Sequence, residues 1–113
     1  MLKIPFLKKL NRRKTVSLVR LTGLISSGSR GGISDSALGS TLDKAFKKGN
    51  PSAVALIINS PGGSPVQSSL VGDRIKRLSE ETKVPTIAFV EDVAASGGYW
   101  IASAADELSL IHI

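Results

Sequence analysis

The heptapeptide Ala94-Ala95-Ser96-Gly97-Gly98-Tyr99-Trp100 decides the fold, because it joins an apolar run to an alanine-rich one. Residues 85–90, which precede it, have the length and the β-branched content of a buried strand. Residues 99–105, which overlap its end, contain several alanines and no helix breaker. The pattern therefore predicts a sharp strand-to-helix turn with Ser96 at its apex.

Two interpretations of Ser96 follow from this turn. Serine is a preferred helix N-cap, so the side chain could serve only to start the helix. Alternatively, Ser96 is a nucleophile, since the neighbouring glycines would allow a second chain to approach closely and leave backbone N–H groups free to face an anion. The heptapeptide alone leaves both interpretations open.

Three other segments have the patterns of strands. Residues 15–21 alternate apolar and polar side chains, which indicates a strand with one solvent-exposed face. Residues 53–58 are apolar throughout, which predicts a central parallel strand covered by helices on each side. Residues 107–111 are a candidate for a fourth strand.

Two helices are expected between these strands. The first begins at the capping segment Ser34-Asp35-Ser36 and ends at Gly49-Asn50. The second begins with Ser64 as N-cap, Pro65 at the first helical position and Gln67 in the place of a capping-box partner. The expected buried positions are Leu38, Leu42 and Phe46 in the first helix and Val66, Leu70, Val71, Ile75 and Leu78 in the second.

Strands and helices thus alternate, which predicts an α/β fold with a mainly parallel sheet and flanking helices. Ligands of such sheets bind beyond the carboxyl ends of the strands. Two glycine turns leave strands at that edge, Gly62-Gly63 after residues 53–58 and Gly97-Gly98 after residues 85–90. We therefore expect the two turns to face each other.

Composition excludes several classes of site. At 113 residues the chain fits one domain, and it has no cysteine and one histidine, His112. Thiol chemistry, disulfides and a histidine-rich metal site are therefore excluded, and we expect no cofactor or metal. The longest apolar run, residues 53–58, is far shorter than the roughly 20 residues of a membrane-spanning helix.

Charge separates the chain into an arm and a domain. Residues 1–34 contain eight basic residues and no acid, whereas the remainder has seven basic and nine acidic residues. We therefore divide the chain into a basic amphipathic arm, residues 1–14, and an α/β domain, residues 15–113. The arm is either simply solvated or rests on an anionic membrane surface. The slightly acidic remainder argues against nucleic acid as a partner.

The glycine turns suggest acyl-transfer chemistry. Such chemistry needs a nucleophile, a base and N–H donors for the oxyanion. Ser96 offers the nucleophile, and the backbone N–H groups of Gly97 and of Gly62-Gly63 offer donors. Two such turns at the exits of buried strands are a stronger signal than one.

These segments resemble the signal peptide peptidase A family of serine peptidases, peptidase family S49. The likeness covers about residues 15–108 and rests on the Asn-Ser-Pro-Gly-Gly-Ser segment at 59–64 and on residues 93–107. It implies the fold of the Clp protease and the crotonases, and cleaved signal peptides or other peptide fragments as substrates. It also implies that Ser96 is the nucleophile and that Gly63 and Gly97, with Gly62 shaping the turn, form the oxyanion hole.

The catalytic base that the family uses has no counterpart among the motifs of this sequence. Its members use a serine–lysine dyad, and in short members the lysine lies tens of residues after the serine. Lys76 and Lys83 precede Ser96, and no motif selects either of them as a base. His112 lies one residue before the end of the sequence, where a histidine more often has no catalytic role. We therefore expect the lysine beyond the end of this chain, with residues 108–113 as a premature end and the C-terminal part of the fold missing.

Other expectations concern assembly, location and alternative functions. Relatives assemble into rings, so a homo-oligomer is expected when the chain is at full length. The basic arm would place the protein in the cytoplasm, at the inner face of the membrane. The alternatives are a non-catalytic peptide-binding or assembly module and a crotonase-like enzyme acting on acyl thioesters.

Overall fold

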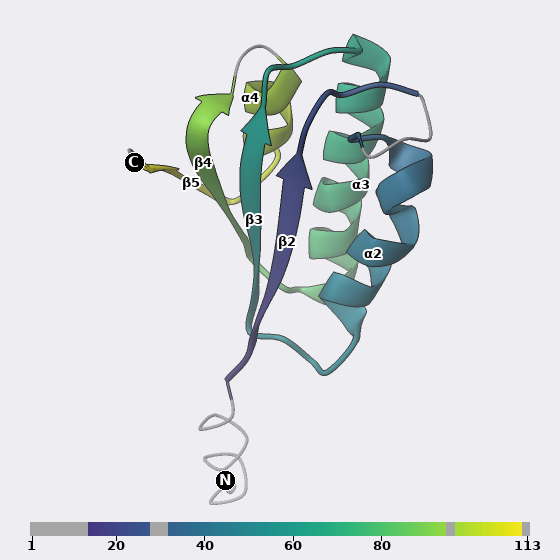
Figure 1. The fold of residues 1–113 in the computed structure, drawn as a ribbon. Coiled ribbons are helices and arrows are strands. Elements are labelled where there is room, and N and C mark those ends of the chain that lie inside the picture. The colour runs from purple at the N-terminus through teal and green to yellow at the C-terminus, as the bar shows by residue number, and fades with distance from the viewer. Residues whose placement is uncertain (1–13, 28–31, 95–96, 112–113) are drawn as a thin grey trace, which may run out of the picture.

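The computed structural model describes residues 14–27, 32–94 and 97–111. Strands and helices alternate along this part of the chain, and all of them were expected from the sequence (Figure 1). The strands are β2 (Val16–Thr22), β3 (Ala53–Ser60), β4 (Thr86–Ala94) and β5 (Glu107–Ile111). The helices are α2 (Asp35–Lys47), α3 (Pro65–Thr82) and α4 (Gly97–Ala102).

The four strands form one parallel sheet in the order β2-β3-β4-β5. One row of paired residues, Val19, Leu56, Ala88 and Leu108, crosses the whole sheet. Each pair of neighbouring strands is joined through a helix, because parallel strands need a crossover connection. The predicted α/β fold with a mainly parallel sheet is therefore confirmed.

The helices cover one face of the sheet. Figure 1 shows α2 and α3 side by side along this face, and α4 contacts α3 as well as β3 and β4. Strands that follow one another in spatial order, with crossovers of one hand, place all their helices on the same side. The prediction of helices on each side of β3 is therefore wrong for the described residues. On the other face, Leu18 of β2 is 59% exposed and Ile57 of β3 is partly exposed.

The core lies between the sheet and this helical layer. In β3 the residues that face the helices, Val54, Leu56 and Ile58, are fully buried. Each such side chain contributes about 1.5–3 kcal/mol through its removal from water. The helices contribute Leu42, Phe46, Val71, Ile75, Leu78 and Ile101 to the same cluster.

Both expected helix caps are present. The hydroxyl oxygen of Ser34 accepts a hydrogen bond from the Ala37 N–H at 3.2 Å, and that of Ser64 accepts one from the Gln67 N–H at 3.2 Å. The reciprocal half of the predicted capping box is absent. The Gln67 side chain instead accepts a hydrogen bond from the Asp35 N–H at 2.9 Å, so it joins α3 to the start of α2.

The interface between α2 and α3 also holds an ion pair. Arg74 donates to both carboxylate oxygens of Asp35, at 2.7 and 3.2 Å, and to Asp43 at 3.3 Å. Gly39 makes room for the guanidinium group, since a β-carbon at that position would lie 3.2 Å from its central carbon. Arg74 is therefore partly buried between the two helices.

Two positions of α3 depart from the predicted buried stripe. Val66 is 65% exposed and Leu70 is 43% exposed, whereas Val71, Ile75 and Leu78 are buried as expected. The buried face of α3 is continued instead by Ser68 and Gly72, small residues that permit close packing. The predicted buried stripe therefore lies on the correct side of α3, but it wrongly includes two exposed residues near the beginning of the helix.

The division into an arm and a domain stays a prediction, because residues 1–13 lie outside the described residues. Where the structure does describe the chain, no helix combines the length and the apolar character that crossing a bilayer requires.

Candidate active site

The two glycine turns leave neighbouring strands at the same edge of the sheet. Ser60, the last residue of β3, is paired with Ala94, the last residue of β4. Gly63 follows Ser60 by three residues, and Gly97, which begins α4, follows Ala94 by three residues. Both turns therefore continue from the carboxyl ends of paired strands, where the sequence predicted a site (Figure 1).

The strand pairing is irregular directly before this edge. Ile58 is paired with Val90, and the next pair joins Ser60 to Ala94. Strand β3 thus advances two residues while β4 advances four, so β4 contains a bulge. Bulges bend a strand and redirect its continuation, and they are frequent beside active sites. This bulge lies in the last part of β4, directly before the segment that contains Ser96.

The first turn requires glycine at Gly63. Its φ angle is +143°, and that of Gly62 is +105°, both in a region that other residues rarely adopt. A β-carbon at Gly63 would overlap the carbonyl oxygen of Ile25 and lie 2.9 Å from its carbonyl carbon. The close approach of two backbones, rather than flexibility alone, is the reason for this glycine.

Ile25 also fixes the direction of the Gly63 amide. The Ile25 N–H donates to the Gly62 carbonyl at 2.9 Å, and the Ser64 N–H donates to the Ile25 carbonyl at 2.7 Å. In a trans peptide the C=O of one residue and the N–H of the next point in opposite directions, and no peptide bond in the described residues is cis. The Gly63 N–H therefore points away from Ile25.

This direction is toward the side of β4. Ile25 lies on the β2 side of β3, since it follows the end of β2, and β4 is the neighbour on the opposite side. The Gly63 N–H and, by the same argument, its C=O point toward the β4 side. Gly63 is exposed, and among the described residues its N–H donates to no hydrogen bond.

Gly62 differs from Gly63 in both respects. It is buried, and its N–H donates to the hydroxyl oxygen of Ser60 at 3.1 Å. Ser60 is itself fully buried. The Gly62 N–H is therefore already hydrogen-bonded within the turn, whereas the Gly63 N–H lies at an exposed residue.

The second turn is only partly described. Ser96, the predicted nucleophile, lies outside the described residues. Gly97 is the first residue of α4, and N–H groups in the first turn of a helix have no acceptor within the helix. The roles of Ser96 as nucleophile and of Gly97 as second donor remain predictions.

Neither Lys76 nor Lys83 lies near the turns. Helix α3 begins at Pro65 beside the first turn, and at 1.5 Å per residue Lys76 lies about 16 Å along its axis and Lys83 about 27 Å along it. Lys83 caps the far end of the helix. Neither residue is therefore a candidate base for this site. His112 lies outside the described residues.

Asp106, which belongs to the segment that resembles the family, forms hydrogen bonds with residues at the beginning of β4. Its carboxylate accepts hydrogen bonds from the Thr86 N–H at 2.7 Å and from the Ser79 hydroxyl at 3.4 Å. Its own N–H donates to the Thr86 hydroxyl at 2.9 Å. Asp106 thus joins the beginning of β4 to the turn before β5, at the edge of the sheet away from the glycine turns.

Sequence reasoning missed Ser60 and Ile25. The signal for Ser60 was present, because a serine placed two residues before a turn residue often accepts a hydrogen bond from the backbone of that residue. Ile25 acts through its backbone, which gives no signal in its side chain. No group of three or more metal-ligating side chains occurs in the described ranges.

Comparisons with known proteins identify the family. The family model described as peptidase family S49 matches residues 79–111. The chain is 48% identical over 96 residues to a protein of Brucella melitensis named Na(+)/H(+) antiporter NhaA, a match that covers 82% of this chain and 13% of that protein. It is 34% identical over 104 residues to protease 4 of Haemophilus influenzae, which covers 88% of this chain and 16% of that protease. The chain belongs to peptidase family S49.

A solved structure supports the fold. The chain is similar to a membrane-bound stomatin-specific protease with a TM-score of 0.63, over 86% of this chain and 44% of that one. At 19% identity this likeness bears on the fold alone, and it confirms the expected Clp protease type of α/β fold. The chain spans less than a fifth of the length of the two relatives named above.

Proposed function

We propose that this chain is the part of a serine endopeptidase that supplies the nucleophile and the oxyanion hole. The observation that supports the proposal most is the direction of the Gly63 N–H, which points away from Ile25 toward the side of β4 and has no acceptor among the described residues. Membership of peptidase family S49 supports it independently.

The proposed reaction proceeds in two steps. The Ser96 oxygen attacks the carbonyl carbon of the scissile bond while a base takes the hydroxyl proton, and the resulting oxyanion accepts hydrogen bonds from the N–H groups of Gly63 and Gly97. The C–N bond then breaks, and the proton passes to the leaving amine. Water subsequently hydrolyses the ester on Ser96 and restores the free enzyme. Loss of one oxyanion donor typically lowers kcat about 100- to 1,000-fold.

The base and the substrates are inferred from the family. We propose a lysine outside the described residues as the base, because Lys76 and Lys83 lie toward the far end of α3. Burial lowers the pKa of such a lysine and makes the neutral amine available. Signal peptides and other peptide fragments are the proposed substrates. Assembly into a homo-oligomer and a location at the cytoplasmic face of the membrane belong to the same proposal.

The test is peptide hydrolysis by the full-length protein. An internally quenched peptide with the sequence of a signal-peptide core should be cleaved, and Ser96→Ala should reduce kcat to background. Ser103→Ala is the matched control, since Ser103 is an exposed serine in the turn after α4, and it should retain activity. Hydrolysis that survives in Ser96→Ala would refute the assignment of the nucleophile.

One observation also favours a second candidate function, a non-catalytic peptide-binding module. The N–H and the C=O of Gly63 point to the same side, so together they could pair with an extended peptide as a strand edge does. In that case peptide binding would be equal in the wild-type protein and in Ser96→Ala, with no cleavage by either. A crotonase-like enzyme would use the same amide but would bind an acyl thioester.

A further inference from the structure

We propose that the amino-terminal edge of the sheet is a docking surface for an anionic membrane, and that it holds the glycine turns away from the bilayer. This edge presents five lysines, which we call the basic edge: Lys14, Lys44, Lys47, Lys48 and Lys83. The proposal concerns where the domain sits and needs no catalysis, so it stands or falls separately from the peptidase activity.

Hydrogen bonds bring the members of the basic edge together. The Ser52 N–H donates to the Thr15 carbonyl at 2.8 Å, which joins the loop after α2 to the start of β2. The Ser17 hydroxyl donates to the Ala45 carbonyl at 2.7 Å, which joins the same strand to the last turns of α2. Lys14 therefore lies beside the end of α2, which carries the three lysines 44, 47 and 48.

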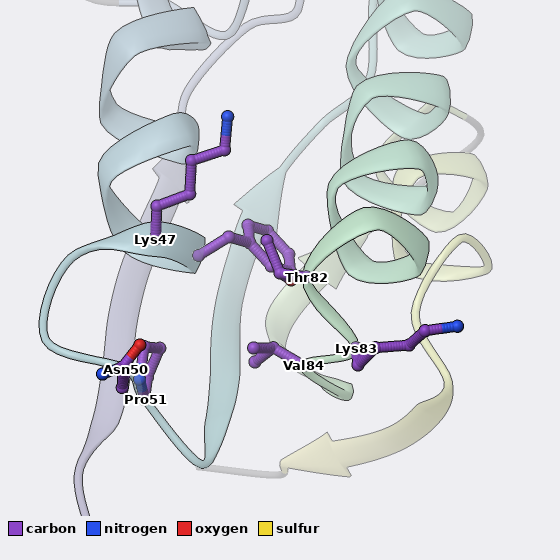
Figure 2. A pocket seen from close by; sticks show the side chains of 7 residues that line it. Lys47, Asn50, Pro51, Thr82, Lys83 and Val84 are labelled. Atoms are coloured by element: carbon purple, nitrogen blue, oxygen red, sulfur yellow. The ribbon is translucent and has the colours of Figure 1, made fainter.

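The fifth lysine comes from the end of α3. Lys47 and Lys83 both line a cavity of about 440 Å³ at this edge, together with Asn50 and Val84. Figure 2 shows the Lys47 side chain extending from the end of α2 in the direction of the strand arrows and the Lys83 side chain extending sideways, away from Lys47. The backbones of both residues belong to this edge of the molecule, on either side of the cavity.

Acidic residues near this edge neutralise part of its charge. Asp43 pairs with Arg74 at 3.3 Å, on the side of α2 that faces α3, and Glu81 pairs with Arg77 at 3.7 Å. Three further exposed acids lie at this end of the sheet: Glu80 on the last turns of α3, Asp106 before β5 and Glu107 at its start. Five lysines against these three acids leave a surplus of positive charge.

The sequence that leads into Lys14 favours a membrane over nucleic acid. Residues 1–13 add five basic residues and no acid, and they interleave these with Leu2, Ile4, Phe6, Leu7 and Leu10. Phosphate contacts along a nucleic acid need the charges but not the apolar side chains. The interface of an anionic bilayer accommodates both, because apolar groups enter the acyl boundary while basic groups remain among the headgroups.

Docking through the basic edge fixes the orientation of the candidate site. All strands are parallel, so the basic edge and the glycine turns lie at opposite ends of β3, whose eight residues span about 25 Å. The Debye length at physiological ionic strength is only about 8 Å. The basic edge therefore anchors the domain without acting electrostatically on the site, which opens toward the aqueous phase.

The first test is vesicle co-sedimentation of the chain. Binding to vesicles that mix phosphatidylglycerol with phosphatidylcholine should exceed binding to pure phosphatidylcholine and should weaken as salt is raised. Replacing Lys44, Lys47 and Lys48 by alanine should lower the partition coefficient by up to about a hundredfold, since each basic residue near the surface contributes about fivefold.

A control with the same loss of charge separates the basic edge from net charge. Arg20 and Lys76 are exposed residues outside this edge, and replacing both by alanine should leave vesicle binding nearly unchanged. The charge-matched double variant with Lys47→Ala and Lys48→Ala should weaken binding by up to about 25-fold. Equal losses in the two double variants would overturn the proposal. Tighter binding to single- or double-stranded DNA than to anionic vesicles at the same salt concentration would also overturn it.

The second test measures orientation through Trp100, the one tryptophan of the chain. It is 53% exposed and lies beside Gly72, ten residues or about 15 Å along α3 from the last residue of that helix. Brominated acyl chains in the vesicles should leave its fluorescence unquenched when the protein is bound. Strong quenching would show that the site end faces the bilayer and would refute the proposed orientation.

Discussion

Replacing Gly63 by alanine tests the geometry of the candidate oxyanion hole most sharply. The new methyl group would overlap the Ile25 carbonyl, which belongs to the backbone and is held by its own hydrogen bonds. The φ angle of +143° adds strain of about 1–3 kcal/mol for a residue with a side chain. If Ile25 moves to relieve the overlap, two backbone hydrogen bonds, each worth about 0.5–1.5 kcal/mol, are weakened.

Together these effects predict a loss of about 2–6 kcal/mol in the free energy of unfolding. Gly49→Ala is the matched control, because Gly49 also has a positive φ, +76°, but a β-carbon there would meet nothing within 4 Å. Its expected loss is about 1–2 kcal/mol, from backbone strain alone.

Urea unfolding of both variants, followed by circular dichroism, gives the comparison directly. In thermal unfolding the difference should appear as a larger fall in Tm for Gly63→Ala, at about 4–8 °C per kcal/mol for a domain of this size. Equal losses in the two variants would refute the claim that contact with Ile25, rather than backbone conformation alone, makes glycine necessary at position 63.

Three further changes test other parts of the account. Ser60→Ala should lower the free energy of unfolding by about 1–3 kcal/mol in urea titration, because the buried Gly62 N–H loses its acceptor; an unchanged midpoint would contradict this. Hydrogen bonds from Arg74 hold the pKa of Asp35 below its usual value, so Arg74→Met should cost about 1 kcal/mol at neutral pH. That cost should shrink as the pH falls below the unfolded pKa of about 3.9 and through the lower folded one, whereas a cost independent of pH would exclude the ion pair as its cause. Asp106→Ala should expose the first residues of β4 to faster amide hydrogen exchange, and unchanged exchange there would show that its hydrogen bonds do not hold the strand.

The order of strands and helices was predictable because each segment carries a local signal. The alternation of residues 15–21 and the caps Ser34 and Ser64 all have the predicted structural consequence. The glycine turns could be placed at one edge of the sheet for the same reason, since parallel strands bring their carboxyl ends together. This much of the site follows from sequence pattern and topology.

The predictions that were wrong concern features that depend on tertiary contacts. Residues 53–58 are apolar on both faces, yet helices cover only one face in the described residues, because spatial order and handedness of the crossovers do not appear in hydrophobicity. Gln67 could not be seen to bind the Asp35 N–H, since its partner lies 32 residues away. Exposed Val66 and Leu70 fit the helical period as well as buried residues would.

The central claim is that Ser96 is the nucleophile and that the Gly63 and Gly97 amides form the oxyanion hole. The measurement that tests it most directly is two-dimensional ¹H–¹⁵N correlation NMR of the protein with a peptidyl boronic acid. The boronate forms a tetrahedral adduct with a nucleophilic serine and presents an oxygen where the oxyanion would lie. We expect an adduct at Ser96, with the amide proton signals of Gly63 and Gly97 shifted downfield and that of Gly62, already bonded to Ser60, little changed. An adduct at Ser96 that leaves the Gly63 amide unshifted, or no adduct at Ser96, would contradict the account.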